Sequence, residues 1–422
     1  MSQEAIISVL IFVAVMVVII TEKVHRAVVA VGGAVLLLIM GILTINEGVG
    51  YIDANTIGLL VGMMLFVGVV KNSGMFEYLA VKSAKVSKGD PWKMMILFMV
   101  ITAIFSALLD NVTTVLLVGP MMLAICKEMN LNPVPYIMTA IMASNIGGTA
   151  TLIGDPPNIM IGSATGYTFG DFIANDCVVI VPVMVATVIF FKFVYGKKLC
   201  ATPEAMESVM HMDERKMIKD AVLLKKAVVM IILIVAGFAL HGVLGLESSM
   251  IALAGATIMM IIGKQDVEKV VLDVEWPTII FFTALFVVVG GMEHAGVIDK
   301  LADVIVNVTD GRPIFTMMII LWVSALLSST LDNIPFVATM IPLIQSMGDS
   351  GMDITPLWWA LSLGACLGGN GTLIGASANV VLTGISSKNG HPITYMEFLK
   401  IGFPVMILSL IICTIYMLIR FA

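Results

Sequence analysis

The sequence predicts an all-α polytopic membrane protein built from two inverted repeats, and three observations support this prediction. Of the 422 residues, 59% are hydrophobic and only 12% are charged, whereas about 25% of the residues of a globular domain are charged. Apolar runs of membrane-spanning length recur along the chain. Polar and glycine motifs of the first half return in the second half at one offset. The composition excludes a soluble enzyme and a disordered chain, and the net charge of −6 gives no basic surface for nucleic acid.

Eight apolar runs are candidates for single crossings once flanking residues complete them. They are 5–20, 27–44, 57–70, 177–194, 227–242, 249–263, 278–293 and 403–419. The first run has no basic residues before it and no small-residue cleavage site after it, so we expect a retained membrane helix rather than a signal peptide. Two longer stretches, 134–165 and 357–385, contain a glycine-rich break. Two others, 94–127 and 314–346, are apolar on both sides of an Asp-Asn pair and can be spans or re-entrant hairpins.

The distribution of basic residues favours the hairpin version. If each hairpin enters and leaves on one side and each broken stretch crosses once, the chain makes ten crossings with its N-terminus outside. The inner side then holds 20 of the 23 basic residues, including Lys23 and Arg26 in an inner loop, in agreement with the positive-inside rule. We therefore expect a multi-pass integral protein of a prokaryotic inner (plasma) membrane. Residues 1–194 form the first repeat, 195–226 a cytoplasmic linker, and 227–422 the second repeat.

The internal repeat has an offset of 222 residues, or 221 later in the chain. Asp110-Asn111-Val112 matches Asp332-Asn333-Ile334, and Asn158 matches Asn379. Between them, the glycine-rich segment 147–154 matches 368–375. Five crossings per half would insert the two copies in opposite orientations. Inverted repeats with broken helices are typical of secondary transporters, which bind their substrate between the repeats near the bilayer midplane.

The two glycine-rich breaks are the candidate binding elements. Glycines free the backbone, and Pro156-Pro157 cannot continue a helix. The freed carbonyls and the neutral Ser, Thr and Asn oxygens are ligands that hard cations accept, and the N–H groups of the next half-helix can hold an anion. The alternative is a packing kink. Including residues beside the Asp-Asn pairs, the candidates are Asn111, Thr113, Ser144, Asn145, Gly147, Gly148, Thr149, Asn158, Asn333, Asn370, Thr372, Ser377 and Asn379.

Three aspartates complete the candidate site. Asp110 and Asp332 lie between apolar runs, where a carboxylate usually faces an aqueous pathway or a partner. Burial favours the protonated form and a nearby cation the charged form, so the competition can couple proton and cation occupancy. The alternative for both is helix capping. Asp155 breaks the repeat, because Ala376 replaces it in the second copy. We expect the tighter cation site, for Na⁺ or a proton, near Asp110, Asn145 and Asp155.

Other classes of function are less well supported. The five cysteines are scattered, and neither a metal-ligand cluster nor a nucleophile–base pair supports an enzyme, so we expect no catalytic residue and no cofactor other than a coupling ion, H⁺ or Na⁺. A passive channel would have an open polar lining. The polar residues here instead cluster at two breaks, which suits an occluded site.

With these motifs, the chain resembles the ion transporter superfamily, and more closely its branch of arsenite permeases and the melanosomal permease called P-protein. Segments 109–114, 145–158, 331–333 and 375–379 carry the resemblance, which also extends to sodium/proton antiporters and divalent anion:sodium symporters. It implies a scaffold domain, a transport domain of two hairpins and two broken helices, elevator-like motion and often a dimer.

The resemblance leaves the substrate open. Dicarboxylate-transporting relatives place Ser-Asn-Thr at each hairpin tip, where this chain has Asp110-Asn111-Val112 and Asp332-Asn333-Ile334. The predicted core holds three aspartates and no Lys or Arg, so a neutral solute such as arsenous acid, a cation, or a singly charged anion with co-bound cations is easier to accommodate than a multiply charged anion. We expect coupled transport of a small inorganic solute or ion, with Na⁺/H⁺ antiport or Na⁺-coupled carboxylate symport as alternatives.

Overall fold

All regular elements of the described residues are helices. The structure is a computed structural model, and it describes residues 2–21, 23–309 and 311–422. The first half contains α1 (Gln3–Ile20), α2 (Arg26–Ile39), α3 (Ile45–Gly50), α4 (Ala54–Val70), α5 (Met75–Val86), α6 (Pro91–Leu108), α7 (Asn111–Glu128), α8 (Val134–Thr149), α9 (Pro156–Thr165), α10 (Phe169–Phe172) and α11 (Val178–Tyr195). A short π-helix, η2 (Ile173–Cys177), joins α10 to α11.

The second half contains α13 (Ala221–Leu244), α14 (Ser248–Gly263), α15 (Val267–Leu272), α16 (Trp276–His294), α17 (Val297–Val308), α18 (Pro313–Thr330), α19 (Asn333–Asp349), α20 (Thr355–Gly368), α21 (Ser377–Lys388) and α22 (Tyr395–Phe421). Between the halves lie α12 (Pro203–His211) and a 3₁₀ turn, η3 (Glu214–Met217). The predicted all-α polytopic fold is confirmed. In the part of the chain that the structure describes, nine helices are long and apolar enough to cross a membrane.

Helix bounds recur at the offset found in the sequence. The bounds of α3, α5 and α6 plus 222 are those of α15, α17 and α18. Two helix-interior prolines, Pro120 in α7 and Pro182 in α11, recur as Pro342 in α19 and Pro404 in α22. The offset that relates residues of the two halves therefore also relates the bounds of these three helix pairs.

Both predicted helix breaks are present. α8 ends at Thr149 and α9 begins at Pro156, while α20 ends at Gly368 and α21 begins at Ser377. Each Asp-Asn pair lies at a turn between two helices that pack against each other, α6 with α7 and α18 with α19. The aspartate of each pair caps the second helix of its hairpin, which removes one unpaired N–H from the helix start.

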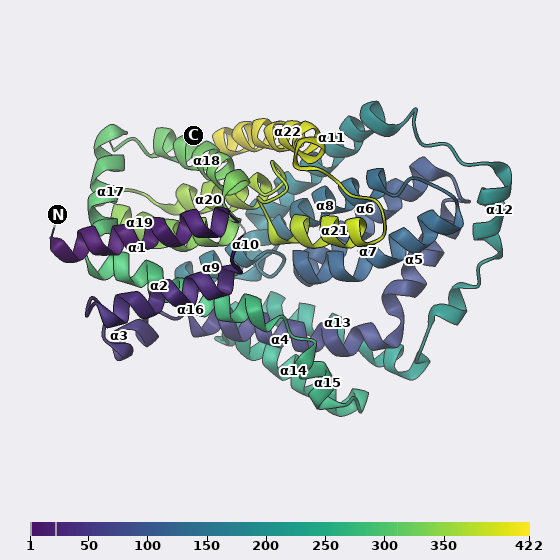
Figure 1. Cartoon of the computed structure of the whole chain (residues 1–422), viewed down its shortest axis with the longest axis horizontal. Coiled ribbons are helices and arrows are strands. Elements are labelled where there is room, and N and C mark those ends of the chain that lie inside the picture. Colours follow the sequence, from purple (N-terminus) through teal and green to yellow (C-terminus); the bar gives the residue numbers. More distant parts are fainter. Residues whose placement is uncertain (1, 22, 310) are drawn as a thin grey trace.

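The helices form two groups that lie side by side (Figure 1). In one group, α4 packs on α14 and α2 on α16, so each pair joins the two halves. In the other, α6 packs on α8, α18 on α20, and α11 on α22. The amphipathic helices α5 and α17 stand at opposite ends of the molecule in Figure 1. Both α5, between α4 and α6, and its equivalent α17, between α16 and α18, connect one group to the other.

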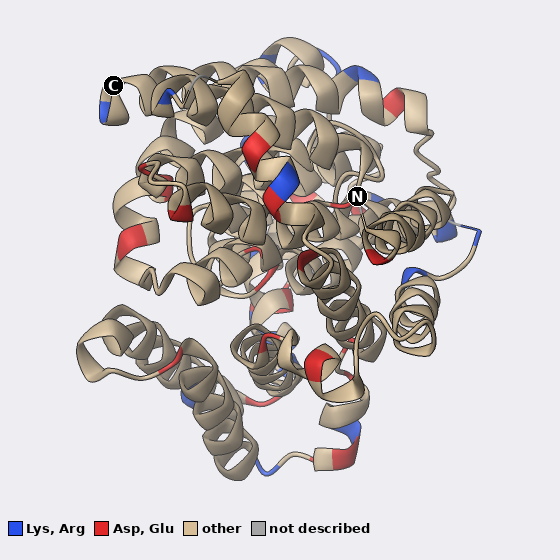
Figure 2. Ribbon diagram, turned by 90° about the vertical axis from the view of Figure 1, so that its left-hand side faces the viewer, with Lys and Arg blue, Asp and Glu red and all other residues tan. Residues whose placement is uncertain are grey.

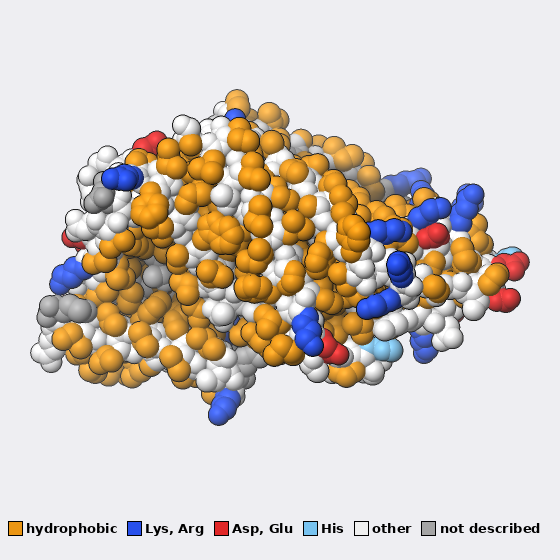
Figure 3. Space-filling model, turned by 90° about the horizontal axis from the view of Figure 1, so that it is seen from above, with side chains coloured by type: hydrophobic (Ala, Val, Ile, Leu, Met, Phe, Trp, Pro, Cys, Tyr) orange, Lys and Arg blue, Asp and Glu red, His pale blue; other side chains and the backbone are white. Residues whose placement is uncertain are grey.

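The surface fits a membrane protein. In Figure 2 the long helices carry few charged residues, which lie mostly at helix ends and in loops. In Figure 3 a broad hydrophobic surface covers the middle of the molecule, and Lys and Arg gather at the end that carries α12. Large apolar side chains such as Phe193 and Ile419 are more than 80% exposed, as expected where lipid replaces water as the solvent.

Candidate functional site

The hairpin tips and helix breaks of both halves meet at two adjoining cavities. The outer cavity has a volume of about 390 Å³, and its lining includes His25, Arg26, Glu275, Asp332 and Ser377. The deep cavity has a volume of only about 10 Å³, close to the space that one water molecule needs. Its lining combines side chains from both halves: Arg26, Asp110, Asn111, Asp155, Glu275, Thr278, Asn333 and Ser377.

The tip of the first hairpin brings Asp110 and Asn111 to the deep cavity. The Asp110 carboxylate accepts a hydrogen bond from the backbone N–H of Thr113 at 2.8 Å, so it caps α7. The Asn111 amide lies 3.5 Å from the Asn145 side-chain oxygen of α8. Both tip residues are buried. The capping interpretation of Asp110 is therefore correct, and the same carboxylate also faces the cavity.

The tip of the second hairpin reaches the other half of the molecule. The Asn333 amide donates to both carboxylate oxygens of Asp155, at 3.3 and 3.4 Å. Asp155 precedes α9, where its side chain makes no capping bond, and it is fully buried. Asp155, which is replaced by Ala376 in the second copy, is thus held by Asn333 of the second hairpin.

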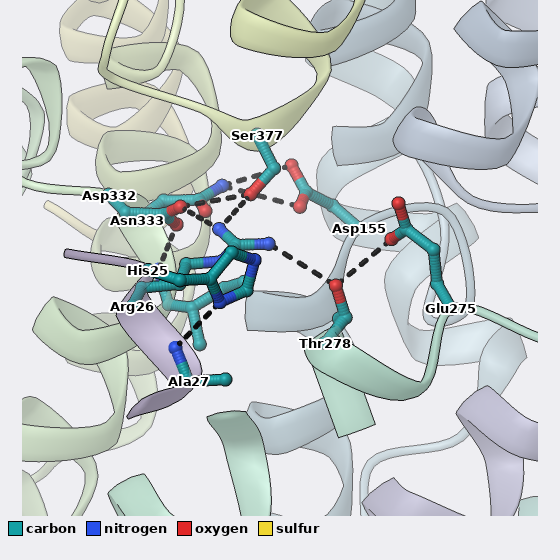
Figure 4. Close-up of polar contacts among 10 residues, drawn as sticks. His25, Arg26, Ala27, Asp155, Glu275, Thr278, Asp332, Asn333 and Ser377 are labelled. Carbon is teal, nitrogen blue, oxygen red and sulfur yellow. Dashed lines mark hydrogen bonds and ion pairs between the residues drawn. The ribbon is translucent and has the colours of Figure 1, made fainter. Parts of the chain in front are cut away.

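Arg26 is the centre of a polar cluster between the two groups of helices (Figure 4). Its guanidinium lies 2.6 Å from the Asp332 carboxylate and 2.5 Å from the Ser377 hydroxyl. A second guanidinium nitrogen donates to Thr278 at 3.2 Å, and Thr278 in turn donates to Glu275 at 2.9 Å. Ser377 also donates to Asp332 at 2.9 Å. The cluster therefore joins α2 and α16 to the second hairpin and the second break.

This position of Arg26 corrects two expectations. The residue is not part of an inner loop, since it begins α2, and its side chain is only 23% exposed. The predicted absence of Lys and Arg from the core is also wrong. Arg26 lies at the end of a helix, so its long side chain can reach inward from a position that the sequence places beside a polar loop.

The first break is held by hydrogen bonds across it. The Asn158 amide of α9 donates to the backbone oxygens of Thr149 and Thr151, at 3.1 and 2.9 Å. A Cβ atom on Gly148 would lie 2.6 Å from the Gly154 oxygen, and one on Gly147 would overlap the Ala103 oxygen. Glycine is therefore required at position 148, where the two sides of the break meet, and at position 147, where the break contacts α6.

The second break repeats this arrangement. The Asn379 amide donates to the backbone oxygens of Gly369 and Thr372, at 2.7 and 2.9 Å. The Thr372 hydroxyl donates to the Ser329 oxygen of α18. Its counterpart Thr151 donates to Ala107 of α6. Each broken helix is thus fastened to the hairpin of its own half.

The two breaks also contact each other. The Asn145 amide donates to the side-chain oxygens of Asn370 and Asn379, at 3.0 and 2.9 Å. At the matching position of the second copy, the Cys366 thiol lies 3.4 Å from the Asn158 side-chain oxygen. Thus Asn145 and Cys366 occupy equivalent positions, and each contacts the bridging asparagine of the opposite half.

Some predicted residues have a structural role in this conformation. The Ser144 hydroxyl contacts Ser106 and the Asn111 backbone oxygen, and the Thr149 hydroxyl donates to the Asn145 backbone oxygen. Thr113 contributes its backbone N–H to the Asp110 cap. These residues shape the tips and breaks rather than line either cavity.

The predicted Na⁺ ligands are only partly brought together. Asp110 and Asp155 line the same deep cavity. Asn145 instead uses its amide to join the two breaks. Among the buried polar atoms of the described residues that have no hydrogen-bond partner are the side-chain oxygen of Asn111 and the side-chain nitrogen of Asn370. Such atoms are available to a bound ion or solute.

Sequence reasoning missed polar residues in and near this centre: Arg26, Glu275 and Thr278 line the deep cavity, and Asp176 and Ser362 lie beside the first break. Asp176 comes directly before the apolar run 177–194, so the bounds of that run exclude it. Arg26 is the single arginine of the first half, which was a usable signal. Glu275 also had a signal in the sequence, because Glu275 and Thr278 match Asp53 and Thr56 at the repeat offset. In the structure the first pair is also hydrogen-bonded, with Thr56 donating to Asp53 at 2.6 Å.

Comparison with known proteins places the chain among membrane transporters. The profile of the citrate transporter (CitMHS) family matches residues 16–364. An uncharacterized transporter of Mycobacterium tuberculosis is 40% identical over 99% of both chains. A 46 kDa membrane protein of Mycobacterium leprae is 38% identical, also over 99% of both.

The human P protein is 32% identical over 95% of this chain, which spans 58% of that longer protein. The predicted resemblance to the P-protein branch is therefore confirmed. Among solved structures, the YdaH transporter of Alcanivorax borkumensis has a TM-score of 0.56 at 15% identity and covers 88% of this chain and 86% of its own. This similarity concerns the fold, and YdaH is itself described as having an unusual topology.

Proposed function

The chain belongs to the citrate transporter family and is a membrane transporter, and from this premise we propose that it is a secondary active carrier. It moves a small inorganic solute or ion across the membrane and couples this movement to H⁺ or Na⁺ by an elevator-type alternation of access, as an arsenite-permease-like protein would. One observation carries the proposal: two hairpin tips and two helix breaks, one of each from either half, converge on one buried polar centre.

A carrier accounts for this geometry better than a passive pore does. The outer cavity narrows to a deep cavity of about 10 Å³ that is bounded by both hairpin tips. A pore needs a continuous polar path, whereas a carrier needs a site closed on one side at a time. Irregular backbone at this depth is tolerated where it is buried or lines a cavity.

The deep cavity suits a proton or a monovalent cation. Its carboxylates, Asp110 and Asp155, supply oxygen ligands, and its volume fits a water-sized species. Across residues 2–21, 23–309 and 311–422, no group of three or more His, Cys, Asp and Glu is arranged to hold a metal. Asp155 accepts from Asn333, so an arriving cation would replace an amide contact between the two halves.

The outer cavity is the proposed place of the solute. It is large enough for a small molecule and contains a cation, Arg26, beside an anion, Asp332. Na⁺-coupled symport of a carboxylate is the second candidate, and Arg26 is the observation that favours it, since guanidinium groups bind carboxylates well. Na⁺/H⁺ antiport is a further alternative that would need only the deep cavity.

The two groups of helices support elevator-type motion. The group with α2, α4, α14 and α16 corresponds to a scaffold, and the hairpins with the broken helices correspond to a transport domain. Arg26 and Thr278 come from the scaffold, while Asp332 and Ser377 come from the transport domain. Movement between the domains would therefore break the Arg26 cluster. A homodimer formed through the scaffold belongs to the same proposal.

Transport assays test the proposal directly. Purified protein in proteoliposomes is offered arsenite, Na⁺, phosphate and citrate in turn, with imposed H⁺ or Na⁺ gradients. We expect gradient-driven accumulation of one of these solutes. Flux that only dissipates the solute's own gradient, whatever H⁺ or Na⁺ gradient is imposed, would instead indicate a passive pore.

A further inference from the structure

A buried carboxyl group lies outside both cavities. Asp176 belongs to the π-helix η2 and is fully buried, yet it lines neither the outer nor the deep cavity. One of its oxygens, Oδ2, lies 2.5 Å from the Ser362 hydroxyl of α20. The other, Oδ1, has no hydrogen-bond partner. Short π-helical segments are frequent at functional sites.

Ser362 connects this carboxyl group to the first helix break. Its hydroxyl oxygen also lies 2.7 Å from the side-chain oxygen of Asn158. The orientation of the Asn158 amide is fixed, because its nitrogen faces two backbone oxygens, those of Thr149 and Thr151. The Asn158 atom that faces Ser362 is therefore a carbonyl oxygen, which accepts hydrogen bonds and cannot donate them.

Counting hydrogens settles the protonation state that this geometry requires. Ser362 has one hydroxyl hydrogen, and it cannot serve both Asn158 and Asp176. If Asp176 is protonated, its carboxyl O–H donates to Ser362, and Ser362 donates to Asn158. If Asp176 is ionised, its carboxylate and the Asn158 oxygen compete for the one hydroxyl hydrogen of Ser362. One of these two short oxygen–oxygen contacts then has no hydrogen bond. Only the protonated form satisfies both contacts.

Among the described residues, no cation forms an ion pair with Asp176. The titratable groups that face it are neutral in their ordinary form: Cys177 beside it, Cys366 of α20, and Cys413 and Tyr416 of α22. Of the neighbouring charges, Arg420 contacts the Asn175 side chain and Asp171 of α10 accepts from Thr168. A buried carboxylate without a partner is costly.

We propose that Asp176 is a proton-binding site that controls the first helix break through Ser362 and Asn158. Release of its proton turns the Ser362 hydroxyl toward the carboxylate. The Asn158 oxygen then keeps only the weak Cys366 thiol contact. Asn158, which bridges the break, is held less firmly, so protonation outside the cavity changes the backbone beside Asp155. The inference deepens the proposed function by naming a proton site, but it stands on its own hydrogen-bond geometry.

Infrared spectroscopy of the purified protein in lipid vesicles tests the proton without any transported solute. At about pH 7, we expect a carbonyl stretching band of a protonated carboxyl group that is missing in Asp176→Asn. In Ser362→Ala the band should remain but move, because the acid O–H loses its acceptor. Asp171→Asn, a nearby carboxylate in a helix cap, is the control and should leave the band unchanged. The proposal would be overturned if Asp176→Asn lost bands of ionised carboxylate but no band of a protonated carboxyl group. It would also be overturned if the protonated carboxyl band did not move in Ser362→Ala.

Hydrogen exchange tests the coupling to the break. As rising pH removes the acid band of the wild-type protein, amide exchange across residues 149–158, corrected for its intrinsic pH dependence, should increase severalfold. Asp176→Asn, whose amide keeps donating to Ser362, should show no such increase. An equal increase in both proteins would contradict the coupling. Neither measurement depends on flux, so failure of the carrier proposal and failure of this one can be told apart.

Discussion

The Arg26 guanidinium lies 2.6 Å from the Asp332 carboxylate, although 306 residues separate the two in the chain. The pair joins the first turn of α2 to the tip of the second hairpin. With the side chain of Asp332 only 11% exposed and that of Arg26 23% exposed, the contact is largely shielded from solvent, and both residues line the outer cavity. It is also an ionic contact between the proposed scaffold and transport domains.

Removal of Arg26 should impair both stability and transport. Arg26→Ala leaves the Asp332 carboxylate without its cation, at an expected cost of about 1–3 kcal/mol in the free energy of unfolding. Adding Asp332→Asn removes the unpaired charge and should recover most of the thermal stability, but not coupled transport. Thermal unfolding and proteoliposome flux of the two single variants and the double variant measure this. Strictly additive losses of stability would show that the two side chains are not coupled.

Asp110→Asn should keep the fold and reduce coupled transport. Asparagine caps helices as well as aspartate does, so the bond to the Thr113 N–H survives while the charge in the deep cavity is lost. Asp90→Asn is the matched control, because Asp90 caps α6 through the Lys93 N–H at 2.9 Å at an exposed position. Flux at full wild-type level in purified Asp110→Asn would leave Asp110 with the capping role alone.

The two breaks should differ in their dependence on cations. Only the first carries a carboxylate, Asp155, and electrostatic attraction is strong in a poorly hydrated site. Asp155→Ala should therefore weaken the Na⁺ or pH dependence of transport far more than Ser377→Ala does. Because Ser377 contacts Arg26 and Asp332, its variant should mainly change solute affinity. Titrations of flux against Na⁺ concentration and pH decide this, and equal changes in both variants would defeat the asymmetry.

The linker between the halves should face the cytoplasm. A cysteine placed at the exposed Lys216 should be labelled by membrane-impermeant reagents only in inside-out vesicles, and one placed at Asp353 only in intact cells. The exposed Cys200 must first be replaced by Ser. Labelling of the Lys216 position from outside would invert the proposed topology and its outside N-terminus.

Docking of the linker on α5 should weaken in acid. The Lys85 ammonium, 2.5 Å from Glu214, holds the pKa of that carboxyl below its usual 4.5. A lowered pKa in the docked state means that the stabilisation is complete above the usual pKa. It is lost as the pH falls through the lowered value. Hydrogen exchange of residues 212–218 should therefore increase below about pH 4.5. Glu214→Gln should show the faster exchange already at neutral pH, and a wild-type profile in this variant would count against the ion pair.

The sequence by itself determined the class of protein and the elements of the site. Its apolar runs predicted helices because the backbone in lipid must satisfy its own hydrogen bonds. The glycines and prolines of 147–157 predicted a broken helix because glycine weakens a helix and proline lacks the N–H donor that would continue it. The repeat of Asp110-Asn111 as Asp332-Asn333 predicted two matched tips, and both are present. These features depend on local chemistry, so neighbouring residues are enough to predict them.

Only the tertiary structure decided which of these elements meet. Asn333 contacts Asp155 of the other half, Arg26 reaches Asp332, and Ser362 joins Asp176 to Asn158. These pairs are 178 or more residues apart, and no local pattern contains them. They follow from the packing of α2 on α16 and of α9 on α19 and α20. The charge of Asp332 is compensated by Arg26, which is distant in the sequence. A charged residue that lies beside a loop in the sequence can therefore belong to the core.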